Sequence, residues 1–149
     1  MKWISGIFST FLGVGFIPIA PGTIAAFITA AAYKFFLFKF SWPVYILLMI
    51  AVFIAGSIAS SIYAKTINKK DPRTVVIDEV LGQLIPLLLL PPEWGLIIAA
   101  FFLFRFFDIL KPLFIKKTEN FPWGWGIMLD DVLSGIYAGI IINIYRLII

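Results

Sequence analysis

The sequence contains no cysteine and no histidine among its 149 residues. Without cysteine the chain can form no disulfide, no thiolate metal site and no cysteine nucleophile. Without histidine it lacks the side chain that most often serves as a general acid or base near neutral pH. Any chemistry must therefore use carboxylates, lysine, arginine, hydroxyls, backbone groups or a bound ion.

Charged residues are also scarce, at 13%, whereas 62% of the residues are hydrophobic and the mean hydropathy is +1.04. Soluble domains are about 45–50% apolar and about 25% charged, and a fold of this length has too little interior to bury so much apolar surface. The composition therefore excludes an ordinary cytosolic domain, a disordered chain and a nucleic-acid binder. The net charge of +4 suits loops that face anionic lipids. The length predicts a single membrane-embedded domain over residues 1–149.

Long uncharged stretches predict an all-α fold, a polytopic membrane helical bundle. Residues 40–64 carry no charge, and these 25 residues exceed the roughly 20 needed to cross a hydrocarbon core. Helices are favoured because lipid offers the backbone no hydrogen-bonding partner. We expect about four to five spanning segments plus a short N-terminal apolar helix, and residues 77–90, which contain Pro86, either span or are re-entrant. The expected helices are residues 4–15, 23–38, 43–64, 77–90, 94–115 and 127–146.

Basic residues are distributed unevenly between the two ends of the predicted helices. If the loop at residues 65–73 is cytoplasmic, alternation of the helices places nine basic residues on its side and three on the other. By the positive-inside rule this asymmetry predicts that the loop faces the cytoplasm. The nine are Lys2, Lys65, Lys69, Lys70, Arg73, Arg105, Lys111, Lys116 and Lys117, and the three are Lys34, Lys39 and Arg146.

Five of the eight acidic residues lie at or inside the ends of apolar segments. A charge at bilayer depth costs roughly 2.5–3.5 kcal/mol on insertion scales, so such residues suggest a function. The predicted topology brings all five to one depth, near the cytoplasmic interface, where oxygen coordination of Mg²⁺ would relieve their repulsion. As an alternative, Asp78 or Asp130 alone caps a helix N-terminus. The five candidate metal ligands are Asp78, Glu79, Asp108, Asp130 and Asp131.

Two further features predict phosphate binding. Arg105, Asp108 and Lys111 are spaced by three and are expected to share one helix face, where the two cations either clamp a phosphate or form an ion pair with the aspartate. A Pro-Gly pair ends an earlier segment, and Thr23 is expected to cap the next helix. The free amides of a helix start bind anions, so Gly22 and Thr23 are candidate phosphate ligands, although a plain turn explains the same residues.

Four motifs, in this order, resemble the membrane phosphatidylglycerophosphatases of type A, and the resemblance runs from about residue 11 to 139. Each motif coincides with a polar cluster described above. The motifs are Gly13-x-Gly15-x-x-Pro18-x-Ala20-Pro21-Gly22-Thr23, Ile77-Asp78-Glu79-x-x-Gly82, Phe104-Arg105-x-Phe107-Asp108-x-x-Lys111-Pro112 and Gly124-x-Gly126-Ile127-Met128-x-Asp130-Asp131-x-x-x-Gly135.

The resemblance implies a Mg²⁺-dependent enzyme that removes the terminal phosphate of phosphatidylglycerophosphate, giving phosphatidylglycerol and inorganic phosphate. It implies a phospholipid as partner and a place in a bacterial-type inner membrane, with several passes and the active site facing the cytoplasm. The expected phosphate ligands are Arg105, Lys111, Gly22 and Thr23. Either water or an aspartate attacks the phosphorus. The candidate catalytic residues are Asp78, Glu79, Asp108 and Asp131.

A small ion or proton transporter is the competing hypothesis, because carboxylates inside a membrane also mark ion pathways. The predicted clusters lie at one interface, however, and the chain shows no pattern of inverted repeats. A structural membrane subunit whose acids pair with a partner's cations is a third interpretation. It leaves the predicted phosphate-binding turns unexplained.

Overall fold

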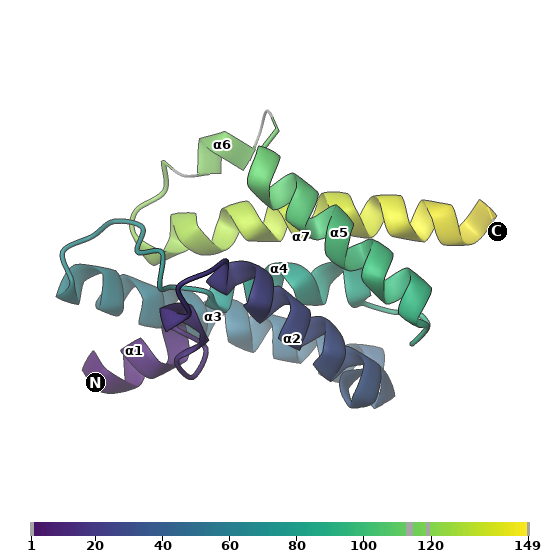
Figure 1. Cartoon of the computed structure of the whole chain (residues 1–149), viewed down its shortest axis with the longest axis horizontal. Coiled ribbons are helices and arrows are strands. Elements are labelled where there is room, and N and C mark those ends of the chain that lie inside the picture. Colours follow the sequence, from purple (N-terminus) through teal and green to yellow (C-terminus); the bar gives the residue numbers. More distant parts are fainter. Residues whose placement is uncertain (1, 113–114, 119, 149) are drawn as a thin grey trace.

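Helices are the only regular secondary structure in residues 2–112, 115–118 and 120–148, which the computed structural model describes. The all-α prediction is therefore confirmed. The longer helices α2, α3, α4, α5 and α7 alternate in direction along the chain (Figure 1). The elements are α1 (Lys2–Ser9), η1 (Val14–Phe16), α2 (Pro21–Phe35), η2 (Leu37–Lys39), α3 (Trp42–Thr66), α4 (Ile77–Leu87), α5 (Trp94–Leu110), α6 (Ile115–Thr118) and α7 (Gly124–Ile148).

Two helices of the described chain, α3 and α7, are long and apolar enough to cross a membrane. Each has 25 residues, and their most apolar windows have mean hydropathies of 2.2 and 1.6. By contrast, α4 has 11 residues, which span about 16 Å, roughly half the thickness of a hydrocarbon core. Helix length thus identifies two candidate spans, and it does not confirm the predicted four to five.

The segment before α2 differs from the prediction. The first helix ends at Ser9 because residues 11–13 all have positive φ, between 49° and 95°. The next helix begins at Pro21, two residues earlier than predicted, and Thr23 is not its cap. Ala20 occupies the capping position in a left-handed conformation, with φ of 46°. Proline suits the first helical position because its φ is already helical and its missing N–H would have no partner there.

Two further predicted helices end early. The helix predicted at 77–90 ends at Leu87, because Leu88 has a non-helical ψ of 123° and Leu89 is left-handed with φ of 61°. The helix predicted to reach residue 115 ends at Leu110, because Lys111 is left-handed with φ of 43°. The last helix begins three residues before its predicted start, so its acidic pair lies about two turns inside it.

Helix α4 is the buried centre of the bundle, and glycines allow α7 to approach it closely. Eight of its eleven residues are buried. A Cβ at Gly82 would overlap the ring of Phe104 and lie 2.9 Å from the carbonyl oxygen of Asp131, and a Cβ at Gly135 would overlap the carbonyl oxygen of Gly82. This backbone contact therefore sets the distance between the acidic residues of α4 and those of α7.

Two tyrosines hold the C-terminal end of α4 in place. Tyr45 of α3 donates a hydrogen bond to the carbonyl oxygen of Leu84 at 2.9 Å, and Tyr33 of α2 donates to that of Leu90. The two tyrosine rings pack edge to face, with centroids 5.9 Å apart. Because these donors satisfy carbonyl groups near the end of a short buried helix, they fix its position along the bundle axis.

Helices α2 and α5 pack against each other through aromatic rings. The rings of Phe35 and Trp94 pack with centroids 6.0 Å apart, and those of Phe27 and Phe101 with centroids 6.1 Å apart. The N-terminal turn of α2 and the last turns of α5 line a common cavity with the first turn of α4.

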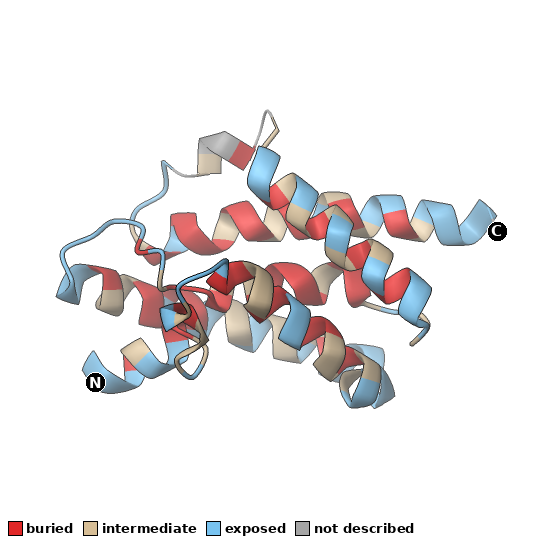
Figure 2. Cartoon of the chain, viewed as in Figure 1, coloured by how far each residue is buried: buried red, intermediate tan, exposed pale blue. Residues whose placement is uncertain are grey.

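Large apolar side chains cover the outward faces of several helices. Leu47 on α3 is 65% exposed, Phe102 on α5 is 64% exposed, and Leu147 on α7 is 86% exposed. Figure 2 shows the exposed positions along the outer sides of these helices. Soluble monomers rarely expose extended apolar surface, so this exterior matches the composition from which a membrane bundle was predicted.

Candidate active site

A cavity of about 490 Å³ lies beside the start of α2 and the end of α5. It is lined by the N-terminal turn of α2, the first turn of α4, the last turn of α5, the first half of α7 and the loop between α3 and α4. The structure thus brings every site residue predicted from the sequence to one cavity. These residues are Gly22, Thr23, Asp78, Glu79, Arg105, Asp108, Lys111, Asp130 and Asp131.

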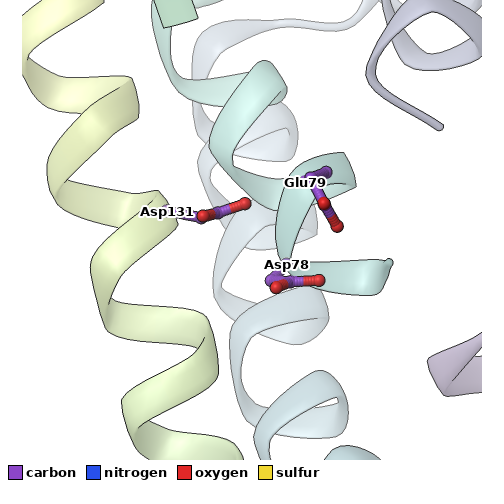
Figure 3. A group of neighbouring side chains, drawn as sticks. All are labelled: Asp78, Glu79 and Asp131. Atoms are coloured by element: carbon purple, nitrogen blue, oxygen red, sulfur yellow. The ribbon is translucent and has the colours of Figure 1, made fainter. Parts of the chain in front are cut away.

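Three carboxylates form a close group at the inner wall of this cavity. Asp78 and Glu79 lie in the first turn of α4, and Asp131 reaches toward them from α7 (Figure 3). One oxygen from each residue can be chosen so that all three lie within 4.8 Å of one another. Three negative charges this close repel strongly unless protons or a cation compensate them.

The donor atoms of this group fit a hard divalent cation. Oδ1 of Asp78, Oε2 of Glu79 and Oδ2 of Asp131 are buried and have no hydrogen-bond partner within the described chain. Leaving such atoms without a partner is costly. All three are carboxylate oxygens, the donors that Mg²⁺ and Ca²⁺ prefer. The unpartnered oxygens therefore satisfy the chemical requirement for the predicted cation.

Desolvation perturbs the two acids of α4, which lie outside the candidate spanning helices. It raises the pKa of Asp78 well above the usual range of aspartate, and the neighbouring Glu79 raises it further. Desolvation also raises the pKa of Glu79, while the hydrogen bond with Asp78 and the charge of Arg105 oppose that shift. A divalent cation in the group would favour the charged forms and reverse both effects.

Arg105 lies between these acids and Asp108. Its Nη1 atom forms an ion pair with Oδ2 of Asp108 and lies 3.8 Å from Oε1 of Glu79. The intrahelical ion pair considered as an alternative is therefore present. The buried Nε–H has no acceptor among the described residues. The guanidinium consequently retains a donor for a ligand oxygen while Asp108 holds its other side.

Lys111 does not share a helix face with Arg105, contrary to the prediction. It follows the end of α5 in a left-handed conformation, and its Nζ donates to Oδ2 of Asp130 at 2.6 Å. The other oxygen of Asp130 accepts the backbone N–H of Asp131 at 3.0 Å. Asp108 and Asp130 thus each form an ion pair with a basic side chain. The acids of the three-carboxylate group, by contrast, each keep a buried oxygen with no hydrogen-bond partner among the described residues.

The N-terminus of α2 packs directly on Glu79. A Cβ at Gly22 would overlap the carboxyl group of Glu79, so a side chain at this position would displace the acid. The amides of Gly22 and Thr23 belong to the first turn of α2, where a helix provides no carbonyl partner. This turn therefore brings backbone donors and a partial positive charge to the same wall as Arg105.

Two charged residues that line the cavity, Asp71 and Arg73, were not predicted as site residues from the sequence. Arg73 was used only to predict topology. The one available signal was that this loop leads within a few residues into the Asp78-Glu79 motif. Because the loop folds back over the start of α4, it brings a further acid and a further cation to the cavity mouth.

Comparisons with known proteins agree with this arrangement. The chain matches the family of phosphatidylglycerophosphatase A over residues 7–146. It is 40% identical to a Bacteroides thetaiotaomicron protein, provisionally named a phosphatidylinositol-3-phosphatase, over 96% of this chain and 94% of that protein. It is 36% identical to phosphatidylglycerophosphatase A of Haemophilus influenzae, over 87% of this chain and 81% of the relative.

A third relative is phosphatidylglycerophosphatase A of Escherichia coli. The identity is 33% and covers 87% of this chain and 76% of the relative. No solved structure matches the chain. Because the family match covers nearly the whole sequence and includes every residue lining the cavity, the chain belongs to the phosphatidylglycerophosphatase A family.

Proposed function

We propose that this phospholipid phosphatase removes the terminal phosphate monoester of phosphatidylglycerophosphate and releases phosphatidylglycerol and inorganic phosphate. The observation that carries the proposal is the cavity in which a three-carboxylate group faces Arg105 and the first turn of α2. Family membership and the names of two relatives support the substrate. The comparisons give no support to the transporter alternative.

The proposed cofactor is Mg²⁺, held by Asp78, Glu79 and Asp131. Their unpartnered oxygens and the lack of any nitrogen or sulfur ligand support a hard cation. When bound, this ion would supply Lewis-acid activation of the phosphoryl group and of water. Asp108 and Asp130, which the sequence suggested as further ligands, are assigned instead to orienting Arg105 and Lys111.

The residues of the chain supply binding and proton transfer. Arg105 donates through its free Nε–H to the phosphoryl oxygens, whose negative charge spreads in a loose transition state. The first amides of α2, at Gly22 and Thr23, donate to the same group, and Lys111 adds positive charge nearby. A carboxylate of the three-carboxylate group accepts the proton from the attacking water.

The proposed location is a bacterial-type inner membrane, with several passes and the cavity at the cytoplasmic face. The exposed apolar exterior supports embedding. Partly or largely exposed tryptophans lie at both ends of the bundle, Trp42 and Trp94 at one and Trp123 and Trp125 at the other, as expected of interfacial belts. In this placement a headgroup reaches the cavity between α2 and α5 while its acyl chains remain in the bilayer.

Removal of divalent cations should abolish phosphate release from phosphatidylglycerophosphate in detergent. We expect EDTA to reduce turnover to background, because the Lewis acid that would activate the phosphoryl group and water is then absent. Mg²⁺ should restore turnover fully and the larger Ca²⁺ poorly. Full turnover in metal-free buffer would refute the cofactor, whereas cation flux into liposomes without any phosphate release would favour the transporter.

Labelling of single cysteines should place the cavity on the cytoplasmic side. The native chain has no cysteine, so Lys69→Cys and Ser41→Cys can be read without background. Both positions are exposed, and they lie near opposite ends of α3. In intact cells an impermeant thiol reagent should modify Ser41→Cys and spare Lys69→Cys until lysis. The reverse pattern would invert the proposed topology.

A further inference from the structure

The cavity contains a third cation, Arg73, to which the proposed reaction assigns no role. Arg105 and Lys111 are each paired with an aspartate. Arg73 lines the same cavity, but it pairs with no carboxylate in the part of the chain that the structure describes. Its one polar contact there is a long hydrogen bond, 3.5 Å, from Nη2 to the carbonyl oxygen of Pro18. Its charge is therefore available to a ligand.

The cations of the cavity lie at different depths. The Arg105 side chain is 15% exposed and touches the buried acids, whereas Arg73 is exposed. The contact with Pro18 holds Arg73 beside the segment that leads into α2. Arg73 therefore lies at the exposed part of the cavity, and Arg105 lies at its buried part.

The proposed substrate has two phosphates with different requirements. The terminal monoester must lie at the three-carboxylate group and Arg105, where the proposed reaction occurs. A phosphodiester joins the headgroup glycerol to diacylglycerol, so it lies outside the inner site when the monoester occupies that site. This diester keeps one negative charge, and it needs a partner near the cavity mouth.

We propose that Arg73 binds this phosphodiester and thereby selects phospholipids that carry a phosphomonoester on the headgroup. The inference rests on the proposed function. Phosphatidate lacks the diester, because its monoester is attached directly to diacylglycerol. Arg73 therefore has no contact to make with phosphatidate when the monoester of that lipid occupies the inner site. A guanidinium suits this role because its planar fork donates to two phosphate oxygens at once.

The test compares steady-state kinetics on short-chain phosphatidylglycerophosphate and short-chain phosphatidate in detergent with Mg²⁺. For Arg73→Gln we expect KM for phosphatidylglycerophosphate to rise about tenfold, the effect of losing one hydrogen bond to a charged group. Its kcat should change little, and its KM for phosphatidate should stay at the wild-type value. Arg73→Lys should recover part of the loss. Lys69→Gln is the matched control, because it removes the same charge from the same loop outside the cavity.

The outcomes separate the inference from the function on which it rests. An Arg73→Gln enzyme with wild-type KM for phosphatidylglycerophosphate overturns the inference, and so does an equal rise in KM on both lipids or an equal rise in Lys69→Gln. If Arg73→Gln does not fold, the ratio of the two KM values in Arg73→Lys decides in the same way. A wild-type enzyme that releases phosphate from phosphatidate alone instead refutes the proposed substrate, and the inference with it.

Discussion

Asp78→Asn and Asp131→Asn should each lower kcat for phosphate release by about 10³-fold, since each removes a charge aimed at the reacting phosphate or its cation. Each acid contributes an oxygen to a group within 4.8 Å, and each has a buried oxygen without a hydrogen-bond partner among the described residues. An amide has nearly the same shape but no negative charge. The measurement is kcat at saturating Mg²⁺ and substrate.

The same variants should not be less stable than the wild type when divalent cations are removed. Asparagine is neutral, so it avoids both the repulsion among these acids and the uptake of a proton that would otherwise relieve it in the metal-free protein. Thermal unfolding in EDTA should therefore occur at an unchanged or higher temperature. Glu93→Gln, at the far end of α5, is the control and should alter neither activity nor unfolding. Activity lost only in proportion to folded protein would show a structural role for these acids.

Arg105→Lys should lower kcat by about 10²-fold, comparable to the removal of one well-placed donor to a developing charge. Arg105 pairs with Asp108 through Nη1 and retains a buried Nε–H for a ligand. Lysine can keep the ion pair, but it is a single point charge and does not present the second, fixed donor. The measurement is kcat and KM for phosphatidylglycerophosphate, with inhibition by inorganic phosphate as a separate test of anion binding.

Arg146→Lys is the matched control for this substitution. Arg146 donates to the carbonyl oxygen of Leu89 at the opposite end of the bundle, so the same chemical change there should leave the kinetics unchanged. If Arg105→Lys kept wild-type kcat, KM and phosphate inhibition, its role would be limited to the ion pair with Asp108.

The sequence predicted the features that depend on composition and local pattern. Helices are required wherever long apolar segments lie in lipid, so α3 and α7 were expected with similar bounds. Charged residues rarely interrupt such apolar segments. Asp78, Arg105 and Asp131 could therefore be recognised from the sequence alone. The four motifs, in their order along the chain, indicated the family.

The sequence could not predict features that depend on how elements meet in space. The left-handed conformation of Lys111 ends α5 and sends the side chain to Asp130 instead of along the helix. The division of the acids into a three-carboxylate group and two ion pairs depends on the rotation of α7 against α4. Arg73 was missed because loop residues carry no periodicity that reports where the loop folds.

The contact between Gly82 and Gly135 has a consequence for the size of ion that the site accepts. Mg²⁺ holds its oxygen ligands at about 2.0–2.1 Å and Ca²⁺ at about 2.3–2.6 Å. Carboxylate side chains can follow part of that difference by rotation, and a larger adjustment requires movement of the helices that carry them. Here a carbonyl and a glycine already touch, so the pair cannot close further, and the packing around them resists opening. A methyl group at Gly135 would press on the carbonyl oxygen of Gly82 and force the two helices apart, and we expect this to shift the preference toward the larger ion without changing any ligand.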